Sequence, residues 1–540
     1  MKMFASFLSL IVSAGFTVSA QLNNPAAPPQ ARTVNGLLEG THHSGIHIFK
    51  GIPFAAPPTG QLRWKEPQPA PNWTGIRMAT QFGPRAMQLP IYSDMNFRSA
   101  SVSEDCLYLN VWTPASSSSE KLPVLVYFYG GGFRAGDGSE FRYDGESIAR
   151  TGVVAITVNY RLAVFGFFAH PALTKESPHH ASGNYGLLDQ AAALVWVQQN
   201  IAAFGGDPKR ITIAGESAGS FSVSAQMASP LSKNIISGAI GESGSLLGLN
   251  TPAPLTEVEK SGLEFAQKLG AGSLDALRAL PADEVLKAAE SQGAPRFPVT
   301  VDGYFFPKSP LEIYAAGEQA HVPLLVGWNS EENGFKSILG ADEPTVTNYT
   351  KALQNRYGDR APGLLKAYPV FSEADVVPMA TRLASDQFIA YGTWKWSDLQ
   401  SKTGGKPVYR YFYSRPRPVT KIAMAKMLLD SSLKAPFAAA AKAVANHGAG
   451  HSIEIEYALG NLPTNLVYEW QSDDYLVSSV MQGYFSNFIK TGNPNGTGLP
   501  AWPALQKQAP VSVLYIDVDT HAAAEKGRDG YLLMDAWGKK

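Results

Sequence analysis

The pentapeptide at residues 215–219 (Gly-Glu-Ser-Ala-Gly) directly follows a short, apolar, β-branched run at residues 211–214. Small residues that can start a helix come after it, so the segment predicts a strand, a sharp turn and a helix. In that arrangement the hydroxyl of Ser217 projects from the edge of a sheet, beside the N–H groups of a helix N-terminus. A Cβ at Gly215 or Gly219 would crowd the turn. The pattern alone is weak evidence, and the surrounding sequence has to support it.

Strands alternate with helices along most of the chain. A helix is predicted near residues 187–201, where apolar residues recur at helical spacing before a Gly-Gly-Asp-Pro stop. This alternation predicts an α/β fold with a large central, mostly parallel sheet flanked by helices. The segments 250–320 and 336–405 are interpreted as helical insertions that form a cap over one sheet edge. Nearly all-apolar runs predict buried strands at 107–112, 124–129, 153–158, 323–327, 408–412 and 513–516.

The first twenty residues have the pattern of a secretory signal peptide. Lys2 is followed by a mostly apolar stretch at 4–18, and Val-Ser-Ala at 18–20 forms a small-residue cleavage site. The alternative is a buried N-terminal helix. We expect residues 1–20 to be removed and residues 21–540 to form a single domain, secreted or periplasmic. No later run has the ~18 apolar residues of a membrane span, and the net charge of +0 does not favour nucleic acid as a partner.

Cys106 is the single cysteine of the chain, so no intramolecular disulfide can form. We expect a packed, inert thiol and not a nucleophile. The chain shows no His, Cys and carboxylate cluster with the spacing of metal ligands, and neither a metal nor a cofactor is expected.

Three consecutive glycines, Gly130 to Gly132, follow the apolar run at 124–129. Such a segment can present bare N–H groups at close range, as stabilisation of a tetrahedral oxyanion requires. The expected donors are the N–H groups of Gly131, Gly132 and Ala218, the last being the residue after the serine. The alternative is an ordinary glycine turn.

Ser217 needs a general base and a carboxylate to orient that base. In the chain order serine, acid, histidine, the base lies late, and His447 and His451 are the candidates. An imidazole can take the serine proton and return it to the leaving group. Glu331 and Glu332 follow the strand predicted at 323–327, and either one could hold the imidazole.

These residues resemble the type-B carboxylesterase and cholinesterase family of α/β-hydrolases. The resemblance spans nearly all of residues 21–540, and the combination of motifs is specific. The motifs that carry it, apart from the serine pentapeptide, lie at residues 49–60, 103–111, 158–161, 183–190, 200–208, 491–495 and 502–503.

The resemblance implies a site in a gorge under the cap. It implies Ser217 as nucleophile, Glu332 as acid (five places after Gly327) and His451 as base (nine places before a glycine). It also gives supporting roles to Glu216, beside the nucleophile, and to Ser243, a buried serine that steadies the acid and the histidine.

The chain departs from the family at two places. Ala86 stands where the family has the cysteine that pairs with the one here numbered Cys106. Asn333 stands where a glycine usually follows the acid. The loop at 86–106 also holds no tryptophan, which makes a choline ester an unfavoured substrate.

The expected activity is hydrolysis of small carboxylic esters by a serine hydrolase through an acyl-enzyme intermediate. Arg134, beside the glycines, is a candidate for binding a carboxylate on the acyl group; the alternative is a surface arginine. Similarity to bacterial members that remove tricarballylate groups from fumonisin-type mycotoxins implies a polyanionic acyl group. The alternatives are a general carboxylesterase, a lipase acting on neutral esters, or a non-catalytic binding protein of the same fold.

Overall fold

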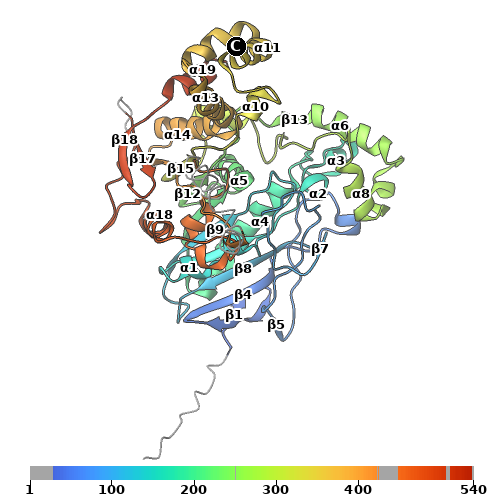
Figure 1. Cartoon of the computed structure of the whole chain (residues 1–540). Coiled ribbons are helices and arrows are strands. Elements are labelled where there is room, and N and C mark those ends of the chain that lie inside the picture. Colours follow the sequence, from blue (N-terminus) through green and yellow to red (C-terminus); the bar gives the residue numbers. More distant parts are fainter. Residues whose placement is uncertain (1–27, 250, 423, 425–447, 506–510, 538–540) are drawn as a thin grey trace, which may run out of the picture.

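The computed structural model describes residues 28–249, 251–422, 424, 448–505 and 511–537 (Figure 1). The expected signal peptide at 1–20 and the candidate base His447 lie outside these described residues. Within them, no helix combines the length and the apolar character needed to cross a bilayer.

The core of the molecule is an 11-stranded sheet. The seven central strands β10, β9, β11, β12, β15, β16 and β17 pair with one another in parallel. The pairs at the two margins are antiparallel, so the prediction of a mostly parallel sheet is confirmed. Across the sheet the order is β18 (His521–Ala524), β17 (Ser512–Ile516), β16 (Val408–Tyr413), β15 (Leu324–Asn329), β12 (Gly238–Glu242), β11 (Gly206–Glu216), β9 (Leu122–Phe128), β10 (Val154–Val158), β8 (Tyr108–Thr113), β4 (Ile46–Pro53) and β3 (Thr41–His43).

The central strands are buried on both faces, as their continuous apolar sequences predict. Every residue of β10, β12 and β15 is buried. The helices α4 (Tyr185–Asn200), α5 (Ala218–Ala228), α14 (Tyr391–Thr403) and α18 (Ser472–Thr491) pack against the sheet. A left-handed Gly205 ends the short turn after α4, at the predicted stop.

Two helical insertions interrupt the alternation, as predicted. In Figure 1, α10, α11, α13 and α19 gather at the end of the molecule opposite the N-terminal strands β1 and β5. The first insertion holds α6 (Leu255–Lys268), α7 (Leu274–Ala279), α8 (Ala282–Ala289) and α9 (Pro310–Ala316); the second holds α10 (Lys336–Leu339), α11 (Val346–Tyr357), α12 (Ala361–Ala367), α13 (Glu373–Ser385) and the π-helical turn η5 (Asp386–Ala390).

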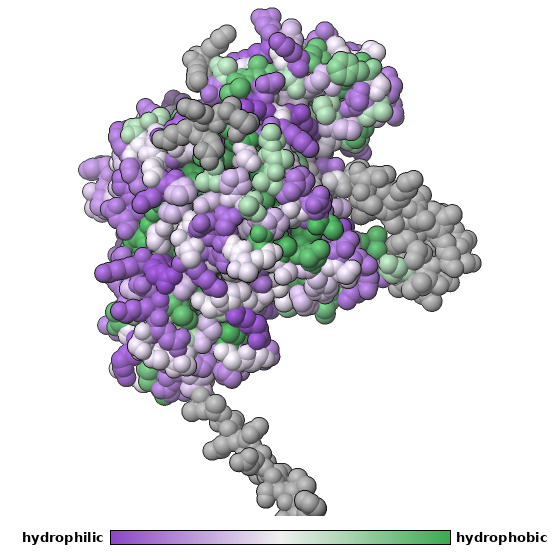
Figure 2. Space-filling view, turned by 90° about the vertical axis from the view of Figure 1, so that its left-hand side faces the viewer, coloured by the Kyte–Doolittle hydropathy of each residue, from purple (hydrophilic) through white to green (hydrophobic). Residues whose placement is uncertain are grey.

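The remaining elements are short or lie at the margins of the sheet. Figure 2 shows the flank on which β18 forms the sheet edge, where hydrophilic side chains predominate between smaller hydrophobic patches. These elements are β1 (Gln30–Thr33), β2 (Gly36–Glu39), β5 (Ile76–Met78), β6 (Arg85–Ala86), β7 (Val102–Ser103), α1 (Glu146–Ala149), α2 (Ala163–Phe167), α3 (Pro171–Glu176), β13 (Ala253–Pro254), β14 (Thr300–Val301), α17 (Ile455–Leu459) and α19 (Arg528–Trp537).

The parallel strands bring distant loops together at their carboxyl ends. β9 leads into the glycines at 130–132, β11 leads into Ser217, and β15 leads into the segment with Glu331 and Glu332. One edge of the sheet therefore collects most of the residues that the sequence marks as candidates.

Candidate active site

Ser217 occupies a sharp turn between β11 and α5. Its backbone has φ 53° and ψ −120°, a strained conformation for a residue with a Cβ. A Cβ on Gly219 would lie 1.9 Å from the carbonyl oxygen of Phe128, and a Cβ on Gly215 would lie 2.6 Å from the same oxygen. The predicted crowding at both glycines is confirmed. The turn places Ser217 in the wall of a cavity.

The imidazole of His451 lies between Ser217 and the carboxylate of Glu332. Its Nε2 is 2.9 Å from Oγ of Ser217, and its Nδ1 is 2.6 Å from Oε2 of Glu332. The other carboxylate oxygen of Glu332 accepts hydrogen bonds from the hydroxyl of Ser243 at 2.5 Å and from the backbone N–H of Asn329 at 2.6 Å. Because both oxygens of Glu332 have partners, the carboxylate holds the ring in one orientation.

The two adjacent acids contact different groups. Glu332 contacts the imidazole ring, whereas the carboxylate of Glu331 accepts a hydrogen bond from the backbone N–H of Gly448 at 2.7 Å. Asn333, the departure from the family pattern, has a φ outside the left-handed region, so its Cβ causes no backbone strain. Its N–H donates to the hydroxyl of Ser385 at the end of α13.

The glycine segment lies beside the nucleophile. Gly131, Gly132 and Ala218 line the same cavity as Ser217. Gly131 and Gly132 have positive φ values of 111° and 64°, and a Cβ on Gly131 would lie 2.1 Å from the carbonyl oxygen of Ala135. The turn therefore requires glycine and brings its backbone to the cavity, as a role in oxyanion stabilisation demands. That role itself remains a prediction.

Glu216 is buried beside the imidazole, with Oε1 at 3.3 Å from Nε2 of His451. Because Nε2 makes its hydrogen bond with Ser217, the contact with Glu216 is electrostatic. Burial raises the pKa of Glu216 to about 8, although the charge of His451 opposes this rise. Burial by itself would lower the pKa of His451, but the charges of Glu216 and Glu332 raise it above its ordinary value. Ionisation of either group therefore favours ionisation of the other.

Two further polar residues, Glu454 and Asn329, belong to this network, and neither was predicted from the sequence as a site residue. Glu454 is buried and accepts a hydrogen bond from the side-chain amide of Asn329 at 2.5 Å, while Oγ of Ser243 lies 3.3 Å from its other oxygen. Burial raises the pKa of Glu454 to about 7, and the charge of Glu332 adds to the rise. The alternation of glutamates with apolar residues at 453–457 is the signal that indicates such a buried acid.

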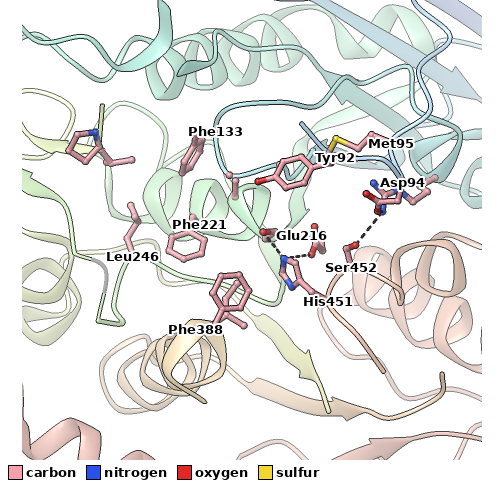
Figure 3. A pocket seen from close by; sticks show the side chains of 18 of the residues that line it. Tyr92, Asp94, Met95, Phe133, Glu216, Phe221, Leu246, Phe388, His451 and Ser452 are labelled. Atoms are coloured by element: carbon pink, nitrogen blue, oxygen red, sulfur yellow. Dashed lines mark hydrogen bonds and ion pairs between the residues drawn. The ribbon is translucent and has the colours of Figure 1, made fainter. Parts of the chain in front are cut away.

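The cavity above Ser217 has a volume of about 560 Å³ and two different ends. Figure 3 shows His451 and Glu216 between them. The apolar end includes Phe133, Phe221, Leu246 and Phe388 and receives residues from both insertions. The other end is more polar and includes Tyr92, Asp94 and Ser452, with Met95 beside them. Arg142 contacts Asp94 and Ser452 at this end. A site of this shape suits an ester with a sizeable apolar part.

Arg134 does not line the cavity. Its half-exposed side chain forms an ion pair with Glu290, just after α8. Among the described residues that line the cavity, Arg142 is the arginine, and its Nε donates to the buried Glu140 at 2.6 Å. Its Nη1 lies 3.2 Å from a carboxylate oxygen of Asp94. Arg142 therefore already has carboxylate partners from the protein.

The sequence and the structure are both similar to known carboxylesterases. The Carboxylesterase family matches residues 27–531. The chain is 35% identical to the fumonisin B1 esterase of Sphingopyxis macrogoltabida, over 92% of this chain and 87% of that protein. It is 32% identical to a liver carboxylesterase of Sus scrofa, over 99% and 97% of the two chains.

Solved structures agree with this result. The carboxylesterase EST55 of Geobacillus stearothermophilus superposes with a TM-score of 0.78 at 30% identity, over 94% of this chain and 99% of that chain. A PNB esterase gives a TM-score of 0.76 at 29% identity, over the same shares of the two chains. The chain therefore belongs to the carboxylesterase family, has the α/β-hydrolase fold and is a carboxylic ester hydrolase.

Proposed function

We propose that the protein hydrolyses esters by nucleophilic catalysis, with Ser217 as nucleophile, His451 as general base and acid, and Glu332 as the orienting carboxylate. The observation that carries this proposal is the pair of contacts made by the imidazole, 2.9 Å to Ser217 and 2.6 Å to Glu332. Both distances lie within the reach that proton transfer requires.

In the first half of the reaction, Oγ of Ser217 attacks the ester carbonyl while Nε2 of His451 takes its proton. The carbonyl oxygen becomes negative and accepts hydrogen bonds from the N–H groups of Gly131, Gly132 and Ala218. When the C–O bond breaks, the imidazolium returns the proton to the departing alcohol. Water then repeats the sequence on the acyl-enzyme, with His451 again as base, and releases the acid.

Substitution of the reacting groups tests this mechanism. Ser217→Ala and His451→Ala should each lower kcat by up to about 10⁶-fold, and the double variant should lose little more, because the two act as a unit. His321→Ala, which removes an exposed histidine, is the control. A fluorophosphonate should label the wild-type protein stoichiometrically and leave Ser217→Ala unlabelled. Full activity of Ser217→Ala would contradict the mechanism, and absence of labelling in the wild type would favour a binding protein.

We further propose that the ester substrate carries a polyanionic acyl group of the tricarballylate type, as fumonisin mycotoxins do. The supporting observation is the 35% identity to a protein described as a fumonisin B1 esterase. The proposed anion-binding group is Arg134, which an incoming carboxylate would have to separate from Glu290. If so, Arg134→Ala raises KM for polyanionic esters, Glu290→Gln lowers it, and neither changes KM for neutral esters of equal size. Equal effects on both ester classes would exclude this role.

Assays that compare classes of ester also test two alternative substrate preferences. A general carboxylesterase would prefer neutral dissolved esters in that comparison. A lipase would turn over emulsified long-chain esters much faster than dissolved short ones.

Export of the protein after removal of residues 1–20, with residues 21–540 as one domain, is also part of the proposal. It rests on the sequence pattern at 2–20. Mass spectrometry of the exported protein should find Gln21 at its N-terminus; an intact N-terminus on the active protein would contradict it.

A further inference from the structure

The segment that carries His451 binds the segment that carries Glu332 through several hydrogen bonds, in addition to the contact between these two side chains. The backbone N–H of Glu331 donates to the carbonyl of Ala449 at 2.8 Å, and the carboxylate of Glu331 accepts from the N–H of Gly448 at 2.7 Å. Glu331 and Gly450 thereby form an isolated parallel β-bridge between the two segments.

Ser330 and Asn329 add one contact each. The hydroxyl of Ser330 accepts a hydrogen bond from the N–H of Ala449 at 2.7 Å. The side-chain amide of Asn329 donates to the carbonyl of Gly450 at 2.8 Å. Three consecutive residues before the acid thus bind three consecutive residues before the histidine. We call residues 329–331 with 448–450 the docking contact.

We propose that Glu331 is a positioning residue of the esterase: by holding the backbone of Gly448, it sets the place of His451 between Ser217 and Glu332. This inference rests on the proposed roles of those three residues. It also gives separate functions to the two adjacent acids, since Glu332 orients the imidazole ring and Glu331 orients the backbone that carries it.

The steric environment of Gly448 supports the proposal independently of the hydrogen bonds. A Cβ on Gly448 would lie 2.1 Å from Oγ of Ser330 and 3.1 Å from Cγ of Glu331. The backbone is therefore pressed against these two side chains, and a side chain at 448 would push the two segments apart. By contrast, a Cβ on Gly334, beyond the acid, would meet no atom within 4 Å.

The segment that carries Glu332 is itself held in place at both ends. β15 ends at Asn329 in the middle of the sheet, and the N–H of Asn333 is bound to Ser385. The acid segment is thus held on both sides, and Glu331 transmits that fixed position to the histidine segment. Because His451 must lie within hydrogen-bond distance of Ser217 and Glu332 together, a displacement of about 1 Å is expected to lower the rate by about 10²-fold.

A matched pair of variants separates the effect of side-chain length at position 331 from the effect of side-chain charge. Glu331→Gln keeps the length of the side chain and an oxygen that can accept from Gly448, but removes the charge. Glu331→Asp keeps the charge but withdraws the oxygen by one methylene. We expect Glu331→Gln to retain kcat within about threefold, and both Glu331→Asp and Glu331→Ala to lower kcat, the latter by about 10²-fold, with KM little changed. Gly448→Ala should resemble Glu331→Ala, and Gly334→Ala should resemble the wild type.

The measurements are kcat and KM for a neutral ester, the rate of labelling by a fluorophosphonate, and the melting temperature of each variant. Wild-type kcat in both Glu331→Ala and Gly448→Ala would overturn the inference, as would a Glu331→Asp variant more active than Glu331→Gln. A loss of kcat explained by a lower melting temperature alone would also overturn it. These outcomes are distinct from failure of the proposed mechanism, in which Ser217→Ala itself would remain active.

Discussion

The imidazole of His451 faces two buried carboxylates that differ in their surroundings. Glu332 has hydrogen-bond donors on both oxygens, whereas Oε1 of Glu216 has no hydrogen-bond donor among the described residues. A carboxylate without donors is poorly stabilised when ionised, and burial accordingly raises the pKa of Glu216 to about 8. Glu332 is thus suited to hold the imidazolium throughout the reaction. Because burial raises the pKa of Glu216, we expect its charge to vary with pH and to alter the basicity of the ring.

Glu216→Gln should therefore move the acidic limb of the pH profile. The ring must be neutral to accept the proton of Ser217, so kcat/KM falls as pH drops through the pKa of His451. The charge of Glu216 raises that pKa; removing the charge lowers it, and the acidic limb moves to lower pH. The measurement is kcat/KM for a neutral ester between pH 5 and pH 11, a range that contains the raised pKa of His451, about 10. An unchanged limb would show that Glu216 does not act on His451.

The elements of the sheet could be predicted because their sequences are almost entirely apolar, as in β9 and β15. The turn at Ser217 could be predicted because two glycines have steric reasons to be there. The ion pair of Arg134 with Glu290 could not, because 156 positions separate the partners and Glu290 belongs to the first insertion, whose path the sequence does not define. Glu454 was not predicted for a similar reason, since its donor Asn329 lies 125 positions earlier in the chain, at the end of β15.

The segment at 86–106 offers a prediction about one element. Ala86 and Cys106 are both buried, and both line the same small cavity with Met87 and Glu104. Ala86→Cys should therefore form a disulfide with Cys106 under oxidising conditions and raise the free energy of unfolding by about 3 kcal/mol, because it closes a loop of about 20 residues in the unfolded chain.

Thiol titration and melting temperature, each measured with and without reductant, check this outcome. Ala86→Ser is the control, because it fills the position without a thiol. Two titratable thiols in the oxidised Ala86→Cys protein, or an equal melting temperature with and without reductant, would contradict it.

At the scale of the whole molecule, the fold buries several acids around the end of the sheet. Burial is the largest cause that raises the pKa of Glu216 to about 8, and of Glu140 and Glu454 to about 7. The pKa of Glu242 is raised as well, by burial and by the charge of Glu454. Ionised carboxylates in this environment are destabilising, and their concentration beside the nucleophile indicates that the site is maintained at the expense of stability.

The pH dependence of stability should reveal this burial. In the unfolded chain these glutamates ionise near pH ~4.3, so between that pH and 7–8 the folded protein binds more protons than the unfolded chain. His451, whose pKa is raised from 6.5, acts in the same direction above that value. Stability from these groups is therefore present at lower pH and is lost as pH rises, so the melting temperature should fall between pH 5.5 and pH 9. Glu454→Gln, which removes one of the buried charges, should flatten the fall; a melting temperature that rises over this range, or an unchanged slope in Glu454→Gln, would show that these acids do not control the stability of the fold.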